Sequence, residues 1–297
     1  MKYALICSTI GSLMKEPNFN CSLLDEALYG MKVELLSQIN DWYLVRTHYR
    51  YEGYVNASSL LMEESKISNW EGMSKAIVTH SYVDVLSLPK VQGACLLSLT
   101  RGALVAVLGP MEENGFVPVL LVDGRCGYIK RKFLGPFINA IFHDDFLHFH
   151  IDSPYHQRIQ AFVKGELQLS EEVFRERVVQ TAISYLGTQY RWGGKTSLGI
   201  DCSGLCAMAY LLNGLVIYRD AKIVTGFPVH EIAYEDKKPG DLLFFPGHVA
   251  MYIGDDRYVH STSKDGSDGV VINSLNPSHE DYREDLVRLL HGTGSVF

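Results

Sequence analysis

A cysteine in a glycine-rich segment and two later histidines are the residues of this sequence best placed to do chemistry. Cys202 lies in the segment Gly-Ile-Asp-Cys-Ser-Gly-Leu, shortly after Tyr-Arg-Trp-Gly-Gly at 190–194. His248 lies in the later run Gly-His-Val-Ala-Met-Tyr-Ile-Gly, and His260 follows it. A thiol and an imidazole are the two groups that a cysteine nucleophile needs for acyl transfer. The pattern therefore predicts a cysteine peptidase.

The residues around Cys202 indicate that its thiol lies in the first turn of a helix. Four apolar residues recur at helical spacing after it, before Gly214 stops the pattern: Leu205, Cys206, Ala209 and Leu212. We expect the positive end of this helix and a nearby imidazolium to lower the pKa of the thiol from about 8.5. Asp201 either caps the helix or meets a cationic group of the substrate, and the polar Ser203 follows.

The two histidines are predicted to meet across a β-hairpin. Short strands are expected at 249–253 and 257–260, with a turn at Gly254 and the two aspartates after it. A turn centred on Gly254 places His248 directly opposite His260, with Cβ atoms about 4.5–5.5 Å apart. His260 then orients His248, as the third member of a catalytic triad does.

Each of these residues has a simpler interpretation when it is taken alone. Free cysteine is among the most buried residue types, so Cys202 on an apolar helix face is also typical of a packed core. A single histidine on a strand is equally ordinary. The glycine-rich approach, the cysteine at a helix start and the two histidines in hairpin register together favour catalysis.

Metal binding is the other chemistry that these residue types offer. One segment is rich in histidine and aspartate: His143, Asp144, Asp145, His148, His150, Asp152 and His156. His148 and His150 share a face if this segment is a strand, and such a pair of imidazoles binds zinc. A polar linker is the favoured interpretation, and the sequence has no Cys-x-x-Cys pair of the kind found in structural zinc sites. We expect neither a metal site nor a cofactor.

The segment from 168 to 297 resembles the NlpC/p60 family of bacterial cell-wall cysteine peptidases, which have a reduced papain-like fold. Five features carry the resemblance: Tyr190, Asp201-Cys202-Ser203-Gly204, Gly240-Asp241-Leu242, Gly247-His248-Val249 and His260. The resemblance implies that Cys202 is the nucleophile, His248 the general base and then acid, and His260 the orienting residue. It also implies that the backbone N–H of Cys202 and the hydroxyl of Tyr190 stabilise the oxyanion.

A narrower likeness concerns the segment Arg219-Asp220-Ala221. It is similar to a segment of the γ-D-glutamyl-L-diamino acid endopeptidases, a branch of the family that acts on freed cell-wall peptides and carries two SH3b domains. In that branch the segment lines the peptide site, which implies that Asp220, Ala221 and Ser203 bind substrate. Glu26 and Tyr51 stand where the branch supplies a Glu and a Tyr that contact the substrate amine.

The likeness further implies a cleft that the first SH3b domain closes at its far end. Such a cleft admits only peptides with a free N-terminal L-alanine. A substrate ammonium that enters it must leave water, and Asp201 together with Glu26 is expected to replace the lost interaction with charge-assisted hydrogen bonds. Intact peptidoglycan is then a poor substrate.

A repeat within the first 135 residues predicts two copies of one small β unit. Gly30-x-x-Val-x-Leu-Leu precedes Gly53-Tyr-Val, and Gly102-x-x-Val-x-Val-Leu precedes Gly127-Tyr-Ile. We predict a multi-domain chain in which two small SH3-like β-barrels precede an α+β papain-like domain. The predicted boundaries are 1–64, 70–136, a linker at 137–167, and 168–297. A single larger sandwich in place of the two barrels is the alternative.

The composition bounds the remaining choices. The 297 residues are 47% apolar and 21% charged, which suits two or three folded domains. A net charge of −7 argues against nucleic acid as a partner, and no apolar run reaches the roughly 20 residues of a membrane span. Ser8, Thr9 and Ser12 interrupt any export signal, and at least one of the six cysteines must stay reduced, so we expect the cytoplasm; the periplasm or cell envelope is the alternative if a leader precedes this sequence. The sequence does not indicate the oligomeric state, and a monomer is assumed.

The predicted activity is hydrolysis of the bond between γ-D-glutamate and an L-diamino acid in L-Ala-γ-D-Glu-L-Lys or its meso-diaminopimelate equivalent. A cell-wall peptide is accordingly the expected partner. Two alternatives stay open: a peptidase that acts on intact peptidoglycan, and an inactive module that binds the wall through its SH3b pair. The sequence does not indicate which diamino acid is preferred.

Overall fold

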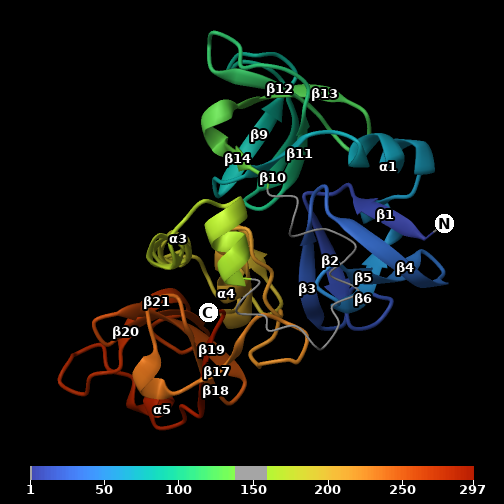
Figure 1. Cartoon of the computed structure of the whole chain (residues 1–297). Helices are drawn as coiled ribbons and strands as arrows, with labels where there is room; N and C mark the ends of the chain where they lie inside the picture. The colour runs from blue at the N-terminus through green and yellow to red at the C-terminus, as the bar shows by residue number, and fades with distance from the viewer. Residues whose placement is uncertain (1, 138–158) are drawn as a thin grey trace. The chain divides into compact units, whose positions relative to one another are not determined.

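The computed structural model describes residues 2–137 and 159–297. The chain divides into two compact units, Met1–Phe142 and His143–Phe297, and each is considered by itself (Figure 1). The segment with the histidine and aspartate cluster at 143–156 lies outside the described residues, as does most of the predicted linker at 137–167.

The first unit contains two separate seven-stranded sheets. The first has the order β3-β2-β6-β5-β4-β1-β7 and is made of β1 Tyr3–Ile6, β2 Ile10–Met14, β3 Leu23–Leu28, β4 Lys32–Ile39, β5 Trp42–Thr47, β6 Glu52–Asn56 and β7 Leu60–Leu61. After helix α1 (Glu64–Glu71), the second has the order β10-β9-β13-β12-β11-β8-β14. Its strands are β8 Lys75–Val78, β9 Tyr82–Leu86, β10 Cys95–Thr100, β11 Leu104–Val107, β12 Phe116–Leu120, β13 Cys126–Lys130 and β14 Leu134–Pro136.

The two sheets have the same strand order when strands are counted from the start of each copy. The predicted pair of small β units is therefore confirmed, and the alternative of one larger sandwich is wrong. The glycines of the sequence repeat occupy equivalent positions in both copies, where the backbone has positive φ or lies too close to a neighbour for a side chain. Gly30 and Gly102 both have positive φ, at 80° and 91°, where a side chain is disfavoured. A Cβ on Gly53 would lie 2.8 Å from Leu13 Cβ, and one on Gly127 would lie 2.6 Å from Val85 Cγ1.

The second unit is built on a six-stranded sheet with the order β17-β22-β18-β19-β20-β21. Its strands are β17 His230–Ile232, β18 Leu242–Phe245, β19 His248–Gly254, β20 Arg257–Thr262, β21 Gly269–Ser274 and β22 Gly292–Ser295. It is accompanied by the α-helices α3 Glu171–Ile183, α4 Cys202–Leu211 and the short α5 Glu284–Val287, and by a small hairpin of β15 Lys195–Thr196 and β16 Gly199–Ile200. Helix α4 packs against α3 and against β19 and β20.

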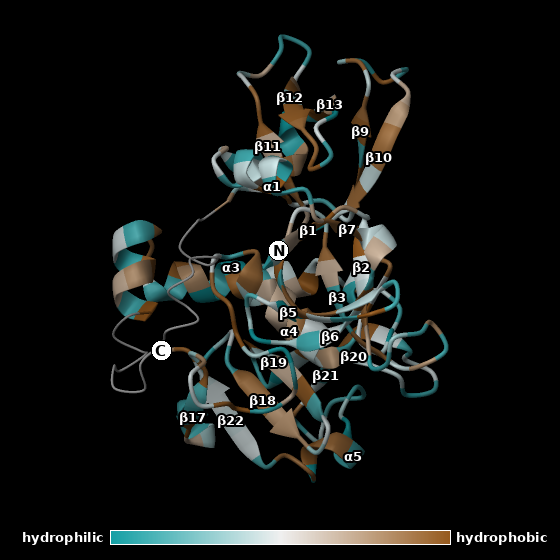
Figure 2. Cartoon of the chain, turned by 90° about the vertical axis from the view of Figure 1, so that its right-hand side faces the viewer, coloured by the Kyte–Doolittle hydropathy of each residue, from teal (hydrophilic) through white to brown (hydrophobic). Residues whose placement is uncertain are grey.

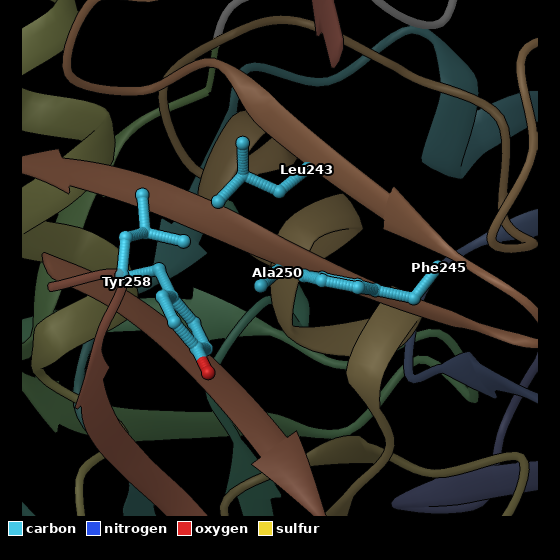
Figure 3. Packing of buried hydrophobic residues seen from close by; sticks show 5 residues of the cluster. Leu243, Phe245, Ala250 and Tyr258 are labelled. Atoms are coloured by element: carbon cyan, nitrogen blue, oxygen red, sulfur yellow. The ribbon is translucent and has the colours of Figure 1, made fainter. Parts of the chain in front are cut away.

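The apolar core of this sheet is formed by its middle strands, which are coloured as hydrophobic in Figure 2. All four residues of β18 are buried. One cluster joins neighbouring strands through Leu243, Phe245, Ala250 and Tyr258, and Figure 3 shows these side chains gathered over the sheet. Residues of the α5 segment, among them Leu286 and Val287, cover the cluster. The sheet is thus a rigid support for the residues at the ends of its strands.

A buried ion pair fastens α3 to the sheet. The guanidinium of Arg175 donates to Asp241 Oδ1 at 2.7 Å, to the carbonyl of Pro239 at 3.1 Å and to Ser295 Oγ at 3.1 Å. Both side chains are nearly inaccessible to water, at 9% and 1% exposed. Arg175 therefore links the helix to the start of β18 and to the end of β22.

Among the residues that the structure describes, no helix combines the length and the apolar character that crossing a membrane requires.

Replacing Asp241 with Ala leaves the buried Arg175 guanidinium with the partly exposed Glu171 as its remaining carboxylate partner, and we expect a loss of about 3 kcal/mol in the free energy of unfolding. Urea denaturation followed by circular dichroism measures it. Lys238→Ala is the matched control, because Lys238 meets Glu171 at 3.4 Å from an exposed position and such pairs contribute about 1 kcal/mol or less. An Asp241→Ala protein as stable as this control would contradict the assignment.

Candidate active site

Cys202 is the first residue of helix α4, as predicted, and Asp201 is the residue that caps it. The Asp201 carboxylate accepts the backbone N–H of Gly204 at 2.6 Å, which satisfies one of the free donors at the helix start. The cysteine is buried, with 6% of its surface exposed. The helix thus presents its N-terminal end at the thiol.

Arg219 holds the Asp201 cap in place. Its guanidinium donates to both carboxylate oxygens of Asp201 at 2.9 Å, to Ser203 Oγ at 2.8 Å and to the carbonyl of Gly194 at 3.2 Å. Arg219 is only 2% exposed. Sequence reasoning noted this arginine beside Asp220 but assigned it no role, because nothing in the sequence shows that a charged residue at this position is buried.

The Asp201 carboxylate has several further partners within the fold. Its Oδ2 atom also accepts the backbone N–H of Gly193 at 2.9 Å, and the hydroxyl of Ser203 donates to Oδ1 at 3.3 Å. Together with the contacts to Gly204 and Arg219, these hydrogen bonds confirm the capping role. The role of Asp201 toward a cationic group of the substrate stays a prediction.

The pKa of Cys202 moves in the direction opposite to the prediction. Burial raises it to about 11, and the negative charge of Asp201 adds to the increase. The backbone N–H groups of Val249 and Ser203 and the charge of Arg219 favour the thiolate, but their effect is smaller. At neutral pH the proton therefore stays on the sulfur, and a neighbouring base must remove it before attack. The interaction with Val249 brings the sulfur beside strand β19.

His248 and His260 are in contact, but through a register that differs from the predicted one. Asp255 and Asp256 both have positive φ and form the turn, so that Met251 pairs with Val259 and Tyr252 with Tyr258. The pairing is shifted by two residues, and an even shift keeps each side chain on its face of the sheet. The histidines are diagonal neighbours, with His248 Nε2 and His260 Nδ1 2.8 Å apart.

A third polar side chain lies behind this pair. His260 is fully buried, and its Nε2 atom is 2.9 Å from Oδ1 of Asn273 on β21. Asn273 Nδ2 donates in turn to the backbone carbonyl of Asp281 at 2.8 Å. The sequence offered no signal for Asn273, since only the pairing of β20 with β21 brings it to this face.

Burial keeps both imidazoles neutral. It lowers the pKa of His248 to about 3, and the neighbouring His260 and Arg283 lower it further. It lowers the pKa of His260 to about 4, where the hydrogen bond that His260 donates to Asn273 opposes the change and Arg283 adds to it. Near pH 7 the site therefore contains a neutral thiol and two neutral imidazoles.

Tyr190 is held near the thiol by a parallel bridge to Ile200. Burial raises the pKa of its phenol, and the charges of the Cys202 thiolate and Asp201 raise it further. The hydroxyl accordingly keeps its proton and remains a hydrogen-bond donor. This property is the one that an oxyanion-stabilising group needs.

A small pocket adjoins the cysteine. Its polar residues are Ser203, Asp220 and Lys222, and its wall is mostly apolar: Cys206, Ile217, Tyr218, Val224, Phe227, Val229, Leu242, Phe244 and Val249. Ser203 and Val249 are the two residues whose N–H groups act on the sulfur, so the pocket opens next to Cys202. Ala221 is half-buried and follows Asp220, but it does not line this pocket.

Glu26 and Tyr51 belong to the first unit. Glu26 is 2% exposed and pairs with Ser12 between β3 and β2, and the half-buried Tyr51 precedes β6. Their role toward the substrate stays a prediction. In the part of the chain that the structure describes, no three His, Cys, Asp or Glu side chains gather in the way that a metal ion requires.

Alkylation of Cys202 tests the direction of its pKa shift. Since only the thiolate reacts, the rate with iodoacetamide should rise with pH to a midpoint well above the value of about 8.5 for a free cysteine peptide. Peptide mass spectrometry separates Cys202 from the exposed Cys95 and Cys126, which report on access of the reagent. A Cys202 midpoint below that of the free peptide would show that the helix and the imidazoles outweigh burial.

Comparison with known proteins supports the peptidase interpretation. Residues 187–288 match the NlpC/P60 family, and residues 13–60 match the bacterial dipeptidyl-peptidase Sh3 domain. A crystal structure of an NlpC/P60 family protein from Bacillus cereus superposes with a TM-score of 0.72 at 20% identity, covering 98% of each chain. This likeness confirms the fold of SH3-like domains followed by an α+β domain.

Proteins with similar sequences support the same assignment. The chain is 39% identical over 297 residues to dipeptidyl-peptidase 6 of Lysinibacillus sphaericus, with 99% of both proteins covered. It is also 38% identical over 98 residues to the γ-D-glutamyl-L-lysine dipeptidyl-peptidase of Bacillus subtilis, covering 29% of this chain and 31% of that protein. Because similarity to the first of these proteins spans the whole length and includes the buried cysteine at the start of α4, this chain belongs to the NlpC/P60 family and is a cysteine peptidase.

Proposed function

We propose that the protein hydrolyses the bond between γ-D-glutamate and the L-diamino acid in cell-wall peptides that begin with a free L-alanine. The observation that carries the proposal is the hydrogen-bonded pair of His248 and His260, whose ring nitrogens are 2.8 Å apart. The residue after His248 on β19 is Val249, and its backbone N–H interacts with the Cys202 sulfur. The names of the two relatives, a dipeptidyl-peptidase and a γ-D-glutamyl-L-lysine dipeptidyl-peptidase, favour release of the dipeptide L-Ala-γ-D-Glu.

The reaction starts from the neutral site. The ring nitrogen of His248 that does not face His260 takes the thiol proton as the sulfur attacks the γ-carbonyl carbon of D-glutamate. The resulting oxyanion receives hydrogen bonds from the backbone N–H of Cys202 and the Tyr190 hydroxyl. His248 then gives its proton to the α-amine of the departing diamino acid, which leaves a thioester on Cys202.

Water completes the cycle. His248, neutral again, takes a proton from the water that attacks the thioester carbonyl, and the C–S bond breaks. The products are L-Ala-γ-D-Glu and the cysteine, which recovers its proton from His248. His260 acts on the reaction through its hydrogen bond to His248, and its role is to orient that ring through both steps.

Specificity is assigned to the pocket beside the thiol. Its apolar wall suits the methyl group of L-alanine, and Asp220 at its polar side suits the ammonium group. Asp201, whose oxygens also serve the helix cap and Arg219, is the second carboxylate proposed for the ammonium group. Ser203 and Ala221 contact the peptide in this proposal, and the role of Glu26 and Tyr51 toward the amine stays a prediction.

The substrate test compares free and blocked peptides. We expect L-Ala-γ-D-Glu-L-Lys to be cleaved after D-glutamate, and N-acetyl-L-Ala-γ-D-Glu-L-Lys to react at least about 100-fold more slowly, because acetylation removes the ammonium charge that the proposed amine site recognises. Cys202→Ala should lower kcat by about 10⁴-fold or more, whereas Cys126→Ala at an exposed site should have no effect. Product identification by mass spectrometry measures each outcome.

Each result of that experiment points to one conclusion. Equal cleavage of the free and acetylated peptides would contradict the amine site but leave the peptidase. Faster release of peptides from intact peptidoglycan than from the tripeptide would favour the wall itself as the substrate. Persistent cleavage by Cys202→Ala would contradict the nucleophile.

The pH profile tests the neutral imidazole pair. Because burial lowers the pKa of His248 to about 3 and of His260 to about 4, the base stays unprotonated well below pH 6.5. We expect kcat/KM to hold its plateau as pH falls through 6.5. In the unfolded chain both imidazoles take up a proton near pH 6.5, so the free energy of unfolding decreases as the pH is lowered below that value. Circular dichroism must therefore confirm that the protein is folded at each pH. An acid limb at or above 6.5 would contradict the shift.

A further inference from the structure

We infer that Asn273 is a positioning residue that sets the tautomers of both histidines, so that the nitrogen of His248 available to the thiol carries a lone pair. This inference rests on the proposed function, because it assigns how the base of that reaction is prepared. Asn273 does not touch the reacting atoms and acts through His260.

Four groups form one continuous chain of hydrogen bonds. His248 Nε2 lies 2.8 Å from His260 Nδ1, and His260 Nε2 lies 2.9 Å from Asn273 Oδ1. Asn273 Nδ2 donates to the carbonyl of Asp281 at 2.8 Å. This series of hydrogen bonds begins at His248 beside the cysteine and ends at the backbone carbonyl of Asp281, which can only accept.

The Asp281 carbonyl determines which partner is the donor in every hydrogen bond of the series. A carbonyl oxygen accepts and never donates, so Asn273 must present its NH₂ group to Asp281 and its oxygen to His260. His260 must then carry its proton on Nε2, and its Nδ1 is a lone pair. That lone pair requires the proton of His248 to be on Nε2. The remaining nitrogen of His248, Nδ1, is left without a proton and ready to accept one.

The opposite tautomer is unproductive. If His260 carried its proton on Nδ1, it would donate to His248 Nε2, and the proton of His248 would move to Nδ1. The base would then have no lone pair for the thiol. In addition, the bare Nε2 of His260 would face the oxygen of Asn273, and two buried acceptors without a proton between them are unfavourable.

The charged groups around the pair explain why an amide suits this position. Arg283 acts on both histidines and disfavours their protonation, while Asp285, which holds Arg283 at 2.7 Å, acts on His260 in the opposite sense. The Tyr258 ring packs against His260 from the same strand, with centroids 5.1 Å apart. Asn273 fixes the proton position without adding a charge, whereas an aspartate there would favour the imidazolium.

Two substitutions separate tautomer control from other roles. Asn273→Leu keeps the size of the side chain and removes the acceptor, and we expect kcat to fall about 10- to 100-fold with KM little changed. Asn273→Asp loses the hydrogen bond to the Asp281 carbonyl but keeps an acceptor for His260 Nε2, so stability should fall while part of the activity returns. Its negative charge raises the pKa of His260, which moves the acid limb of kcat/KM to higher pH.

Arg257→Gln is the matched control for a purely structural role. Arg257 pairs with the Asp281 side chain at 2.6 Å, so its loss loosens the segment that Asn273 also holds, without touching the hydrogen-bond chain. We expect this variant to lose thermal stability and to keep kcat within about twofold. A loss of kcat equal to that of Asn273→Leu would show that Asn273 only anchors the segment, and would overturn the inference.

Nitrogen NMR reads the tautomers without any substrate. In protein labelled with ¹⁵N-histidine, signals of His248 and His260 are assigned by their loss in His248→Gln and His260→Gln, and both rings should be protonated at Nε2. Asn273→Leu should give a mixture, and Asn273→Asp should restore the single tautomer. Protonation of His260 at Nδ1 in the native protein would overturn the inference. If the native protein cleaves no cell-wall peptide, the proposed function fails, and the NMR result still decides the tautomers.

Discussion

The contact between Arg219 and Asp201 is the interaction on which the proposed site depends. It joins three segments that are distant in the sequence: the glycines at 193–194, the first turn of α4 and the residues after the helix. Burying two charges is unfavourable unless their hydrogen-bonding capacity is satisfied, and here both side chains are fully engaged. Without Arg219, the Asp201 carboxylate would be a buried charge, and the cap that places Cys202 would be lost.

Burial has a second consequence, which concerns protons. It disfavours every charged form in the site, so it raises the pKa of the thiol and lowers the pKa of both imidazoles. The resting site is neutral, and the thiolate forms only when His248 accepts the proton. For that reason the position of the proton on each ring matters more here than it would in a preformed thiolate–imidazolium pair. The series of hydrogen bonds from the Asp281 carbonyl to His248 fixes the position of the proton on each ring.

The same sheet carries both catalytic and supporting roles. His248 and His260 lie on β19 and β20, which together with β18 form the cluster of Phe245, Ala250 and Tyr258. Arg175 ties α3 to this sheet through Asp241. The histidines are therefore held by packing and by hydrogen bonds on rigid elements, which is the condition for keeping two rings at hydrogen-bonding distance.

Several features of the fold and the site were determined by the sequence alone, because they depend on residues that are close together along the chain. The glycines of the repeat predicted two equivalent β units, because positive φ and close backbone approach exclude a side chain at the same places in each copy. The helix start at Cys202 followed from the apolar spacing and from the capping residue Asp201. The meeting of His248 with His260 followed from the two-residue period of strands, which survives a shift of two.

Only the tertiary structure decided the rest, because it depends on neighbours that are remote in sequence. The turn conformation of Asp255 and Asp256 set the true register of the hairpin. The buried Arg219 showed what holds the Asp201 cap in place. The pairing of β20 with β21 brought Asn273 behind His260. The pKa of Cys202 rose because desolvation depends on how the whole domain covers the thiol, and no local pattern of residues reports that quantity.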